Sequence, residues 1–255
     1  MSYIVQYGSQ PQDPHSHGYI FVVSHMRSFS SLLCHILGSH PEIDGYVETH
    51  QSYFGRVDLN RLTRKVSETT GSPVSGRYVL DKMLDDDKSL APNILARQNV
   101  KVLLLVRRAD ETVNSILNLA RARGVMGRFS DAQSVVDYYT TRLEQLAGYG
   151  AQLGRSALFL EAERLIDETE QVLDGLAHWL DLGAPLSATY RTFKLSGVAG
   201  YGDPSPAIMT GRIVMDAEDR HRSYVPIDIP EQAARRAREA YAACRDNLLT
   251  RNYRP

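Results

Sequence analysis

The chain lacks the features of a disulfide-rich or membrane-spanning protein. Its two cysteines, Cys34 and Cys244, stand far apart and in no metal-binding or CxxC spacing, which argues against a disulfide framework and a zinc site. The longest apolar run, 100–106, contains a lysine and is far shorter than the roughly 20 residues that span a bilayer. Residues 1–18 lack the charged and then apolar pattern of a signal peptide. We therefore expect a cytoplasmic protein without a membrane span.

A large excess of charge of one sign is also absent. The formal net charge is only −1 at pH 7, so the chain has no overall attraction to nucleic acid or to an anionic membrane, and any anion site must be local. We expect no nucleic-acid partner. With 255 residues, of which 43% are hydrophobic, the chain can bury one sizeable core. We predict a single domain over 19–255, preceded by a flexible N-terminal arm over 1–18.

Short apolar runs alternate with segments of helical periodicity. The run 19–23 is β-branched and aromatic, and a polar turn and helical spacing from Leu32 to Leu37 follow it. Further strands are expected at 77–80, 100–106 and 156–160, and further helices at about 110–122, 132–146, 169–180 and 231–249. This order predicts an α/β fold with three layers, in which a mainly parallel sheet carries helices on both faces and a binding crevice at the carboxyl ends of its strands. The Gly-, Pro- and Ser-rich segment 191–229 is expected to form a long structured loop.

The loop after the first strand has the composition of an anion site. It joins a buried strand to a helix, so it offers unpaired N–H groups and the positive end of the helix dipole. Arg27 can bind an oxyanion through two N–H groups, and the hydroxyls of Ser28, Ser30 and Ser31 can donate to further oxygens. The lysine and glycines of the ATP-binding pattern GxxxxGKS or GxxxxGKT are missing. An ordinary serine-capped helix start is the alternative interpretation.

A second group of anion-binding residues follows the strand at 100–106. Arg107 and Arg108 stand at its carboxyl end, and Ser115 lies on the next helix. An arginine and a hydroxyl in this arrangement can hold one phosphate, although two solvated arginines would show the same pattern. Two anion sites at the ends of two strands suit a ligand with two separate anionic groups.

Both segments resemble the donor-binding motifs of the sulfotransferases that use 3′-phosphoadenosine 5′-phosphosulfate (PAPS). SHMRSFSSLLCHILGSHPEI resembles the 5′-phosphosulfate loop, commonly PRSGTTLL followed by a helix and HPE; Arg27, Ser28, Phe29, Ser30, Ser31 and Leu32 fall on that pattern. Phe29 replaces the usual glycine, so the loop either tolerates a side chain there or approaches the donor less closely. VLLLVRRADETVNSIL resembles the 3′-phosphate segment, in which a serine follows the arginine by eight positions, as Ser115 follows Arg107. The resemblance implies the P-loop-like sulfotransferase fold.

The same resemblance suggests residues for the chemistry. Glu48, followed by Thr49, stands 21 residues after Arg27, the spacing of a Glu-Thr pair in the tyrosylprotein branch, which implies that Glu48 is the catalytic base. His50 and His25 are the alternatives, because a histidine titrates near neutral pH. Lys82, in YVLDKML, resembles the family's lysine that follows the next strand and reaches the leaving oxygen.

Two further segments lie near these candidates. Tyr201 and Gly202, in GVAGYGDPSPAIMTGRI, resemble the glycine-rich region close to the donor's adenine and 3′-phosphate. The run Asp85, Asp86 and Asp87 is interpreted as a solvated turn, and no metal is assigned.

The hypothesis from the sequence is therefore a PAPS-dependent sulfotransferase without a metal. It would transfer a sulfuryl group to a hydroxyl of a small-molecule, carbohydrate or lipid acceptor. Acceptor pockets in this fold are built by variable loops, so the residues predict neither the acceptor's identity nor the oligomeric state. A nucleotide or small-molecule kinase with a degenerate phosphate loop and a non-catalytic nucleotide-binding protein are the alternatives.

Overall fold

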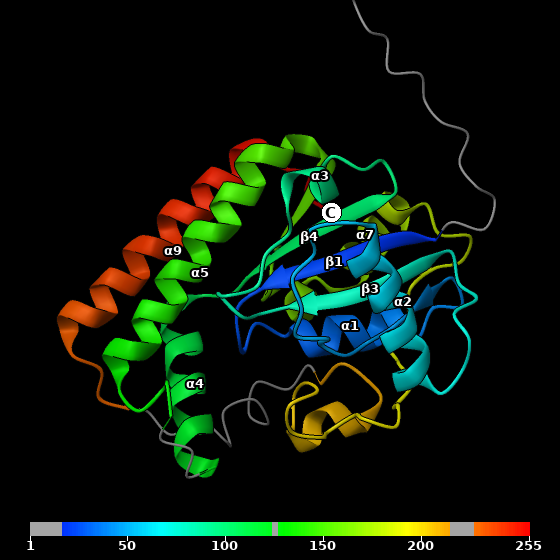
Figure 1. Ribbon diagram of the computed structural model, residues 1–255. Coiled ribbons are helices and arrows are strands. Elements are labelled where there is room, and N and C mark those ends of the chain that lie inside the picture. Colours follow the sequence, from blue (N-terminus) through cyan, green and yellow to red (C-terminus); the bar gives the residue numbers. More distant parts are fainter. Residues whose placement is uncertain (1–16, 124–126, 215–226) are drawn as a thin grey trace, which may run out of the picture.

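The centre of the molecule is a five-stranded sheet with all strands parallel, in the order β2-β3-β1-β4-β5 (Figure 1). The computed structural model describes residues 17–123, 127–214 and 227–255. The strands are β1 Gly18–Ser24, β2 Ile43–Asp44, β3 Tyr78–Met83, β4 Val100–Val106 and β5 Ala157–Glu161. The predicted α/β class and parallel sheet are confirmed.

Helices cover both faces of the sheet, as the three-layer prediction requires (Figure 1). One face carries α1 Ser30–Gly38, α6 Arg164–Asp167 and α7 Thr169–Leu180. The other carries α2 Arg56–Thr70, α3 Pro92–Leu95, α4 Ala109–Arg123, α5 Ala132–Leu153 and α9 Glu231–Arg251. Two short 3-10 helices, η1 Gly154–Ser156 and η2 Pro206–Thr210, complete the described elements. None of the helices in the described ranges is long and apolar enough to cross a membrane.

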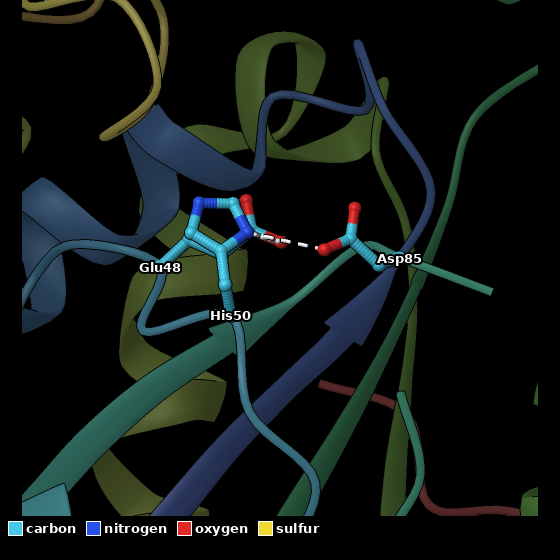
Figure 2. A group of neighbouring side chains, drawn as sticks. All are labelled: Glu48, His50 and Asp85. Carbon is cyan, nitrogen blue, oxygen red and sulfur yellow. Dashed lines mark hydrogen bonds and ion pairs between the residues drawn. The ribbon is translucent and has the colours of Figure 1, made fainter. Parts of the chain in front are cut away.

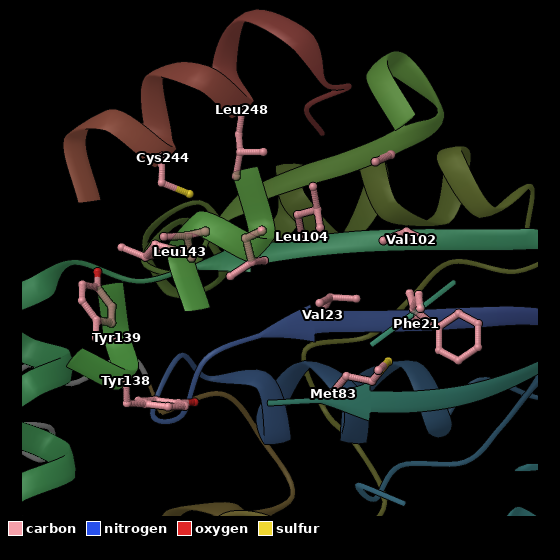
Figure 3. Packing of buried hydrophobic residues seen from close by; sticks show 14 of the residues in the cluster. Phe21, Val23, Met83, Val102, Leu104, Tyr138, Tyr139, Leu143, Cys244 and Leu248 are labelled. Atoms are coloured by element: carbon pink, nitrogen blue, oxygen red, sulfur yellow. The ribbon is translucent and has the colours of Figure 1, made fainter. Parts of the chain in front are cut away.

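The apolar runs are continuous because each strand buries both of its faces. On β1, Ile20 and Val22 point to the α1 and α7 layer, whereas Phe21 and Val23 point to the opposite layer. Each of these side chains is fully buried, which stabilises the fold by about 1.5–3 kcal/mol apiece. Figure 3 shows the second layer, in which side chains of α5 and α9 pack over the sheet. The labelled helix residues are Tyr138, Tyr139, Leu143, Cys244 and Leu248.

Several element boundaries differ from the sequence prediction. The structure adds α2 and the two-residue strand β2, which the sequence analysis missed. In α2 only Leu59, Leu62 and Val66 are buried, so the helix has a narrow apolar stripe in a mostly polar segment. β3 continues to Met83, three residues beyond the expected end, and Lys82 therefore lies within the strand and does not follow it.

The ends of the domain also need a correction. Of the expected arm, 1–18, residues 1–16 lie outside the described ranges. Gly18 is the first residue of β1, and the ring Nδ1 of His17 lies 2.9 Å from the carbonyl oxygen of Gly76. These two residues thus belong to the fold. Part of the expected 191–229 loop, 215–226, also lies outside the described ranges, and the extent of the single domain stays a prediction.

The carboxyl ends of β1, β3 and β4 meet at one edge of the sheet. Ser24 pairs with Leu105 of β4, and Val23 pairs with Met83 of β3. Arg142 of α5 is fully buried behind this edge. Its Nε donates to the carbonyl of Ser24 and its Nη2 to the carbonyl of Met83, each at 2.7 Å. One side chain therefore fixes the ends of the two strands from which the candidate site grows.

Candidate functional site

The loop from β1 to α1 adopts a glycine-like backbone without containing glycine. Arg27 and Phe29 both have φ of 61°, in the left-handed region, and Phe29 is the N-cap residue of α1. A non-glycine residue in this conformation costs about 1–2 kcal/mol. The ring of Phe29 lies 4.2 Å from the guanidinium of Arg107, a cation–π contact that offsets part of this cost. Of the two expected outcomes, the loop thus tolerates a side chain at the position of the family's glycine.

The interior of this loop is held by its own side chains. The Ser28 hydroxyl donates to the His25 carbonyl at 2.7 Å and lies 2.6 Å from the Ser24 hydroxyl. Ser28 is fully buried, so its hydroxyl does not face a ligand as expected, and a ligand contact from this residue would come from its backbone. Ser30 is also buried at the first turn of α1. The N–H groups of 30–32 have no partner within the helix, because they belong to its first turn.

His25 is not placed to act as a base. It is fully buried, its Nδ1 donates to the carbonyl of Met26, and its Nε2 accepts the N–H of Arg107 at 3.0 Å. Burial lowers the pKa of His25 to about 3. This histidine joins the β1 and β4 loops in its neutral form with both ring nitrogens engaged, an arrangement that disfavours it as the base.

Arg27, Arg107 and Ser115 form a connected chain. Nε of Arg27 donates to the Ser115 hydroxyl at 2.9 Å, and Nη1 of Arg107 donates to the carbonyl of Arg27 at 2.9 Å. Ser115 therefore contacts Arg27, whereas the sequence analysis expected it to act with Arg107. Nη2 of Arg107 bonds to Glu111 at 2.9 Å, while its Nε is buried without a partner among the described residues. Arg108 is exposed, which agrees with the choice of the earlier arginine.

Lys82 brings a buried positive charge to the start of α1. Its Nζ lies 3.2 Å from the Ser31 hydroxyl and 3.9 Å from Oε2 of Glu48. The side chain is fully buried. The ammonium therefore stands between the anion loop and the candidate base.

Glu48 is buried, although a lone glutamate in a loop is ordinarily solvated. Only 8% of its side chain is exposed, and its Oε1 accepts the N–H of Leu84 at 3.1 Å. Burial raises the pKa of Glu48, and the nearby charges of Lys82 and His50 oppose this effect. A buried carboxylate with a raised pKa is suited to accept a proton near neutral pH.

A fully buried carboxylate, Asp81, holds the segment that carries Glu48. It accepts the N–H and the hydroxyl of Thr49, each at 2.9 Å, and the Tyr53 hydroxyl at 2.5 Å. Burial raises the pKa of Asp81, while these hydrogen bonds oppose the shift. Asp81 was not among the residues predicted from the sequence. An aspartate inside an otherwise apolar strand was the signal that could have identified it.

Glu48, His50 and Asp85 form a polar cluster (Figure 2), and Lys82 lies beside its Glu48. His50 Nδ1 lies 3.1 Å from Oδ2 of Asp85 and 3.7 Å from Oε1 of Glu48, and its Nε2 donates to the carbonyl of Gly200 at 2.9 Å. The hydrogen bond to Asp85 raises the pKa of His50 to about 9. A protonated imidazole donates from both nitrogens and cannot accept a proton, so this geometry favours Glu48 over His50 as the base.

The cluster also corrects the interpretation of the aspartate run. Asp85 pairs with His50 and Asp86 pairs with Arg128, so neither is a purely solvated turn residue. The ligand atoms of Glu48, His50 and Asp85 lie within 4.8 Å of one another, close enough to hold a metal ion if His50 gave up its proton. The expectation of no metal stays a prediction.

A loop from the C-terminal third, 200–205, lies against the anion loop. The N–H of Asp203 donates to the Ser31 hydroxyl at 2.9 Å, and Nη1 of Arg27 lies 2.8 Å from Oδ1 of Asp203. Gly202 has φ of 155°, and a Cβ added to it would lie 3.1 Å from the Ser31 hydroxyl oxygen and 3.6 Å from Nζ of Lys82. Tyr201 is 43% exposed. The structure thus brings Gly202 to the site as expected, and adds Asp203, which the sequence analysis missed.

The comparisons with known proteins identify the fold. No protein-family model matches the chain, and no curated protein sequence matches it. Among solved structures, the chain is similar to a protein described as the sulfotransferase domain from the curacin biosynthetic pathway. The match has a TM-score of 0.57 and 18% sequence identity, and covers 88% of this chain and 97% of that one. The chain therefore has the fold of a sulfotransferase domain.

Proposed function

We propose that the protein is a sulfotransferase that uses PAPS as its donor and transfers the sulfuryl group to a hydroxyl. The observation that carries this proposal is the meeting of an anion loop, a buried lysine and a buried glutamate at one sheet edge. Ser31, Lys82 and Glu48 are connected there by contacts of 3.2 and 3.9 Å. The fold shared with a sulfotransferase domain supports the same chemistry.

The described residues fit a donor with two anionic ends. The first-turn N–H groups of α1, the Ser31 hydroxyl and Lys82 would hold the 5′-phosphosulfate. At the other end, the buried Nε of Arg107 lacks a partner within the described part of the chain, and such an orphaned donor is costly unless a ligand satisfies it. Arg107 and Ser115 are the proposed site of the 3′-phosphate, and Arg27 of the 5′-phosphosulfate loop bonds to both of them.

The proposed chemistry is a direct in-line transfer. The acceptor oxygen forms a bond to sulfur while the bond between sulfur and the bridging phosphate oxygen breaks. Glu48 takes the hydroxyl proton, and Lys82 with the loop N–H groups stabilises the negative charge on the leaving phosphate. Because all these groups are held by buried contacts, they need little rearrangement during the reaction. The acceptor is proposed to be a small molecule, a carbohydrate or a lipid.

Phosphoryl transfer is the second candidate, and the Glu48–His50–Asp85 cluster is the observation that favours it. A kinase needs a divalent cation beside its phosphates, and these three side chains could supply ligands. His50 would first have to lose its proton, which its raised pKa opposes.

Calorimetric titration separates the two candidates without an acceptor. The protein is titrated with 3′-phosphoadenosine 5′-phosphate in EDTA, then with 5′-AMP, and then with ATP and magnesium. We expect clear preference for the 3′-phosphorylated nucleotide. A preference for magnesium-ATP would overturn the sulfotransferase proposal. Binding of the 3′-phosphorylated nucleotide with no turnover of PAPS on any hydroxyl acceptor class would support a non-catalytic nucleotide-binding protein.

A further inference from the structure

The 200–205 loop places the Asp203 carboxylate beside Arg27, a residue of the proposed donor site. Oδ1 of Asp203 lies 2.8 Å from Nη1 of Arg27, and the two side chains are about three-quarters buried. Ser205 fixes the carboxylate through its N–H at 3.0 Å and its hydroxyl at 2.8 Å. A carboxylate held against an arginine in this way satisfies the same donors as a phosphate or sulfate oxygen.

The same loop also covers the other donor-binding groups. The N–H of Asp203 donates to the Ser31 hydroxyl, and Gly202 lies against Ser31 and Lys82. The carbonyl of Gly200 accepts a hydrogen bond from His50, beside Glu48. One short loop therefore contacts the anion loop, the buried lysine and the polar cluster at the same time.

The segment that precedes this loop, 193–196, is firmly anchored. The Ser196 hydroxyl lies 2.7 Å from Nε2 of the buried His35, and the ring of Phe193 stacks on Tyr46 with centroids 4.1 Å apart. The N–H of Leu195 donates to the Tyr46 hydroxyl at 3.1 Å. These contacts fix the segment 193–196 on His35 of α1 and on Tyr46, which follows β2.

The 200–205 loop itself is held by contacts of a different kind from those of segment 193–196. The contacts that dock the 200–205 loop on the site are hydrogen bonds and an ion pair, and the Tyr201 side chain of this loop is 43% exposed. An anionic ligand can replace polar contacts of this kind with its own hydrogen bonds and ion pairs. The aromatic packing of segment 193–196 would stay in place. Gly200 and Gly202 give the backbone freedom to move at two points.

We propose that Asp203 acts as an internal competitor of the donor, and that the 200–205 loop is a gate which the donor opens by displacing the Asp203 carboxylate from Arg27. This inference rests on the proposed donor site. Because the site must spend part of its time closed, the apparent affinity for the donor is reduced by the fraction of molecules in the open state. Loss of the Asp203 charge should therefore tighten donor binding.

The test compares Asp203→Asn with the wild type by titration with 3′-phosphoadenosine 5′-phosphate at fixed ionic strength. Asparagine keeps the size of the side chain and an oxygen for Ser205, but removes the charge that competes for Arg27. If about nine molecules in ten are closed, the variant binds about tenfold more tightly. Asp246→Asn, on α9, is the matched control for the change in net charge, and its affinity should equal that of the wild type.

The alternative outcomes have different meanings. Equal affinity of Asp203→Asn and the wild type overturns the gate but leaves the donor site standing. Weaker binding by the variant also overturns the gate, and assigns Asp203 to the support of Arg27 in the bound state. No binding of the nucleotide by either protein overturns both the gate and the proposed function.

A second variant keeps the test valid if Asp203→Asn folds poorly in a thermal melt. Ser205→Ala removes the hydroxyl that holds Oδ2 of Asp203 and leaves the carboxylate itself unchanged. The gate predicts a smaller gain in affinity, about twofold to threefold, because the variant loses one hydrogen bond to the carboxylate and keeps its charge beside Arg27. Unchanged or reduced affinity of this variant would contradict the gate.

Discussion

Replacement of Arg142 by methionine should destabilise the fold and weaken the site together. Arg142 is fully buried, and its guanidinium holds the carbonyls of Ser24 and Met83 and the side chain of Gln145, each at 2.7 Å. Methionine fills a similar volume but donates no hydrogen bond. The two carbonyls at the ends of β1 and β3 would lose their shared donor.

The expected loss in the free energy of unfolding follows from these hydrogen bonds. A buried carbonyl that loses its partner costs about 1–3 kcal/mol, so the two carbonyls together give about 2–6 kcal/mol. Removal of the guanidinium regains part of this free energy, because a buried charge is costly. Burial accordingly lowers the pKa of Arg142. We expect the free energy of unfolding to fall by about 3 kcal/mol, which corresponds to a urea midpoint about 1 M lower.

Urea denaturation followed by circular dichroism measures the loss, and the nucleotide titration measures the site. Arg238→Met is the control, since Arg238 is an exposed arginine of α9 that bonds to the exposed Asp110. Its midpoint should move far less than that of Arg142→Met. The reasoning is refuted if Arg142→Met keeps the wild-type midpoint, or if it loses stability with an unchanged affinity for 3′-phosphoadenosine 5′-phosphate.

Three further predictions address the site. Glu48→Gln should lower turnover of PAPS with a phenolic acceptor by about 10²–10⁴-fold while nucleotide affinity changes little, and full activity would exclude Glu48 as the base. Arg107→Gln should weaken 3′-phosphoadenosine 5′-phosphate binding at least about tenfold but leave 5′-AMP binding nearly unchanged, whereas the exposed neighbour Arg108→Gln serves as the control in both titrations. Because His50 has a folded-state pKa of about 9, above its ordinary value of 6.5, its contribution to stability is fully present below pH 6.5 and is lost as the pH rises through 9. Thermal melts across this range should show that loss in the wild type and not in His50→Asn, and identical pH profiles would contradict the ion pair.

The sequence predicted those parts of the structure that depend on neighbours along the chain. The apolar runs that became β1, β4 and β5 are each followed by helical periodicity, so the class of fold and the edge that carries the site could be anticipated. Arg27, Ser31 and Arg107 could be selected as candidates for the same reason, because each stands in the loop or first turn after a strand. Phe29 was recognised as a departure from the glycine of the family pattern, and its backbone conformation agrees with that comparison.

What the sequence could not predict depends on contacts between distant segments. Asp81 is 32 residues from Thr49, and Asp203 is 176 residues from Arg27, so neither pairing leaves a local pattern. The same applies to Ser28, whose hydroxyl turned inward, and to His25, whose ring nitrogen bonds to the backbone of the β4 loop. Burial raises the pKa of Glu48. The burial of a loop residue is set by the packing of the whole domain, so it leaves no local pattern in the sequence.

The aromatic N-cap of α1 has a consequence for how the anion loop binds. A glycine at position 29 would leave the unfolded and the unliganded loop with many backbone conformations, which a ligand would have to restrict. Phe29 has far fewer and disfavours the left-handed one that it adopts, so the contact of its ring with Arg107 is what helps to hold the loop in that conformation. The loop is therefore preorganised, and the entropy lost on binding is correspondingly smaller. Through the same ring the anion loop contacts Arg107, so we expect the two proposed anion sites to keep a fixed spacing and to select ligands by the separation of their charged ends.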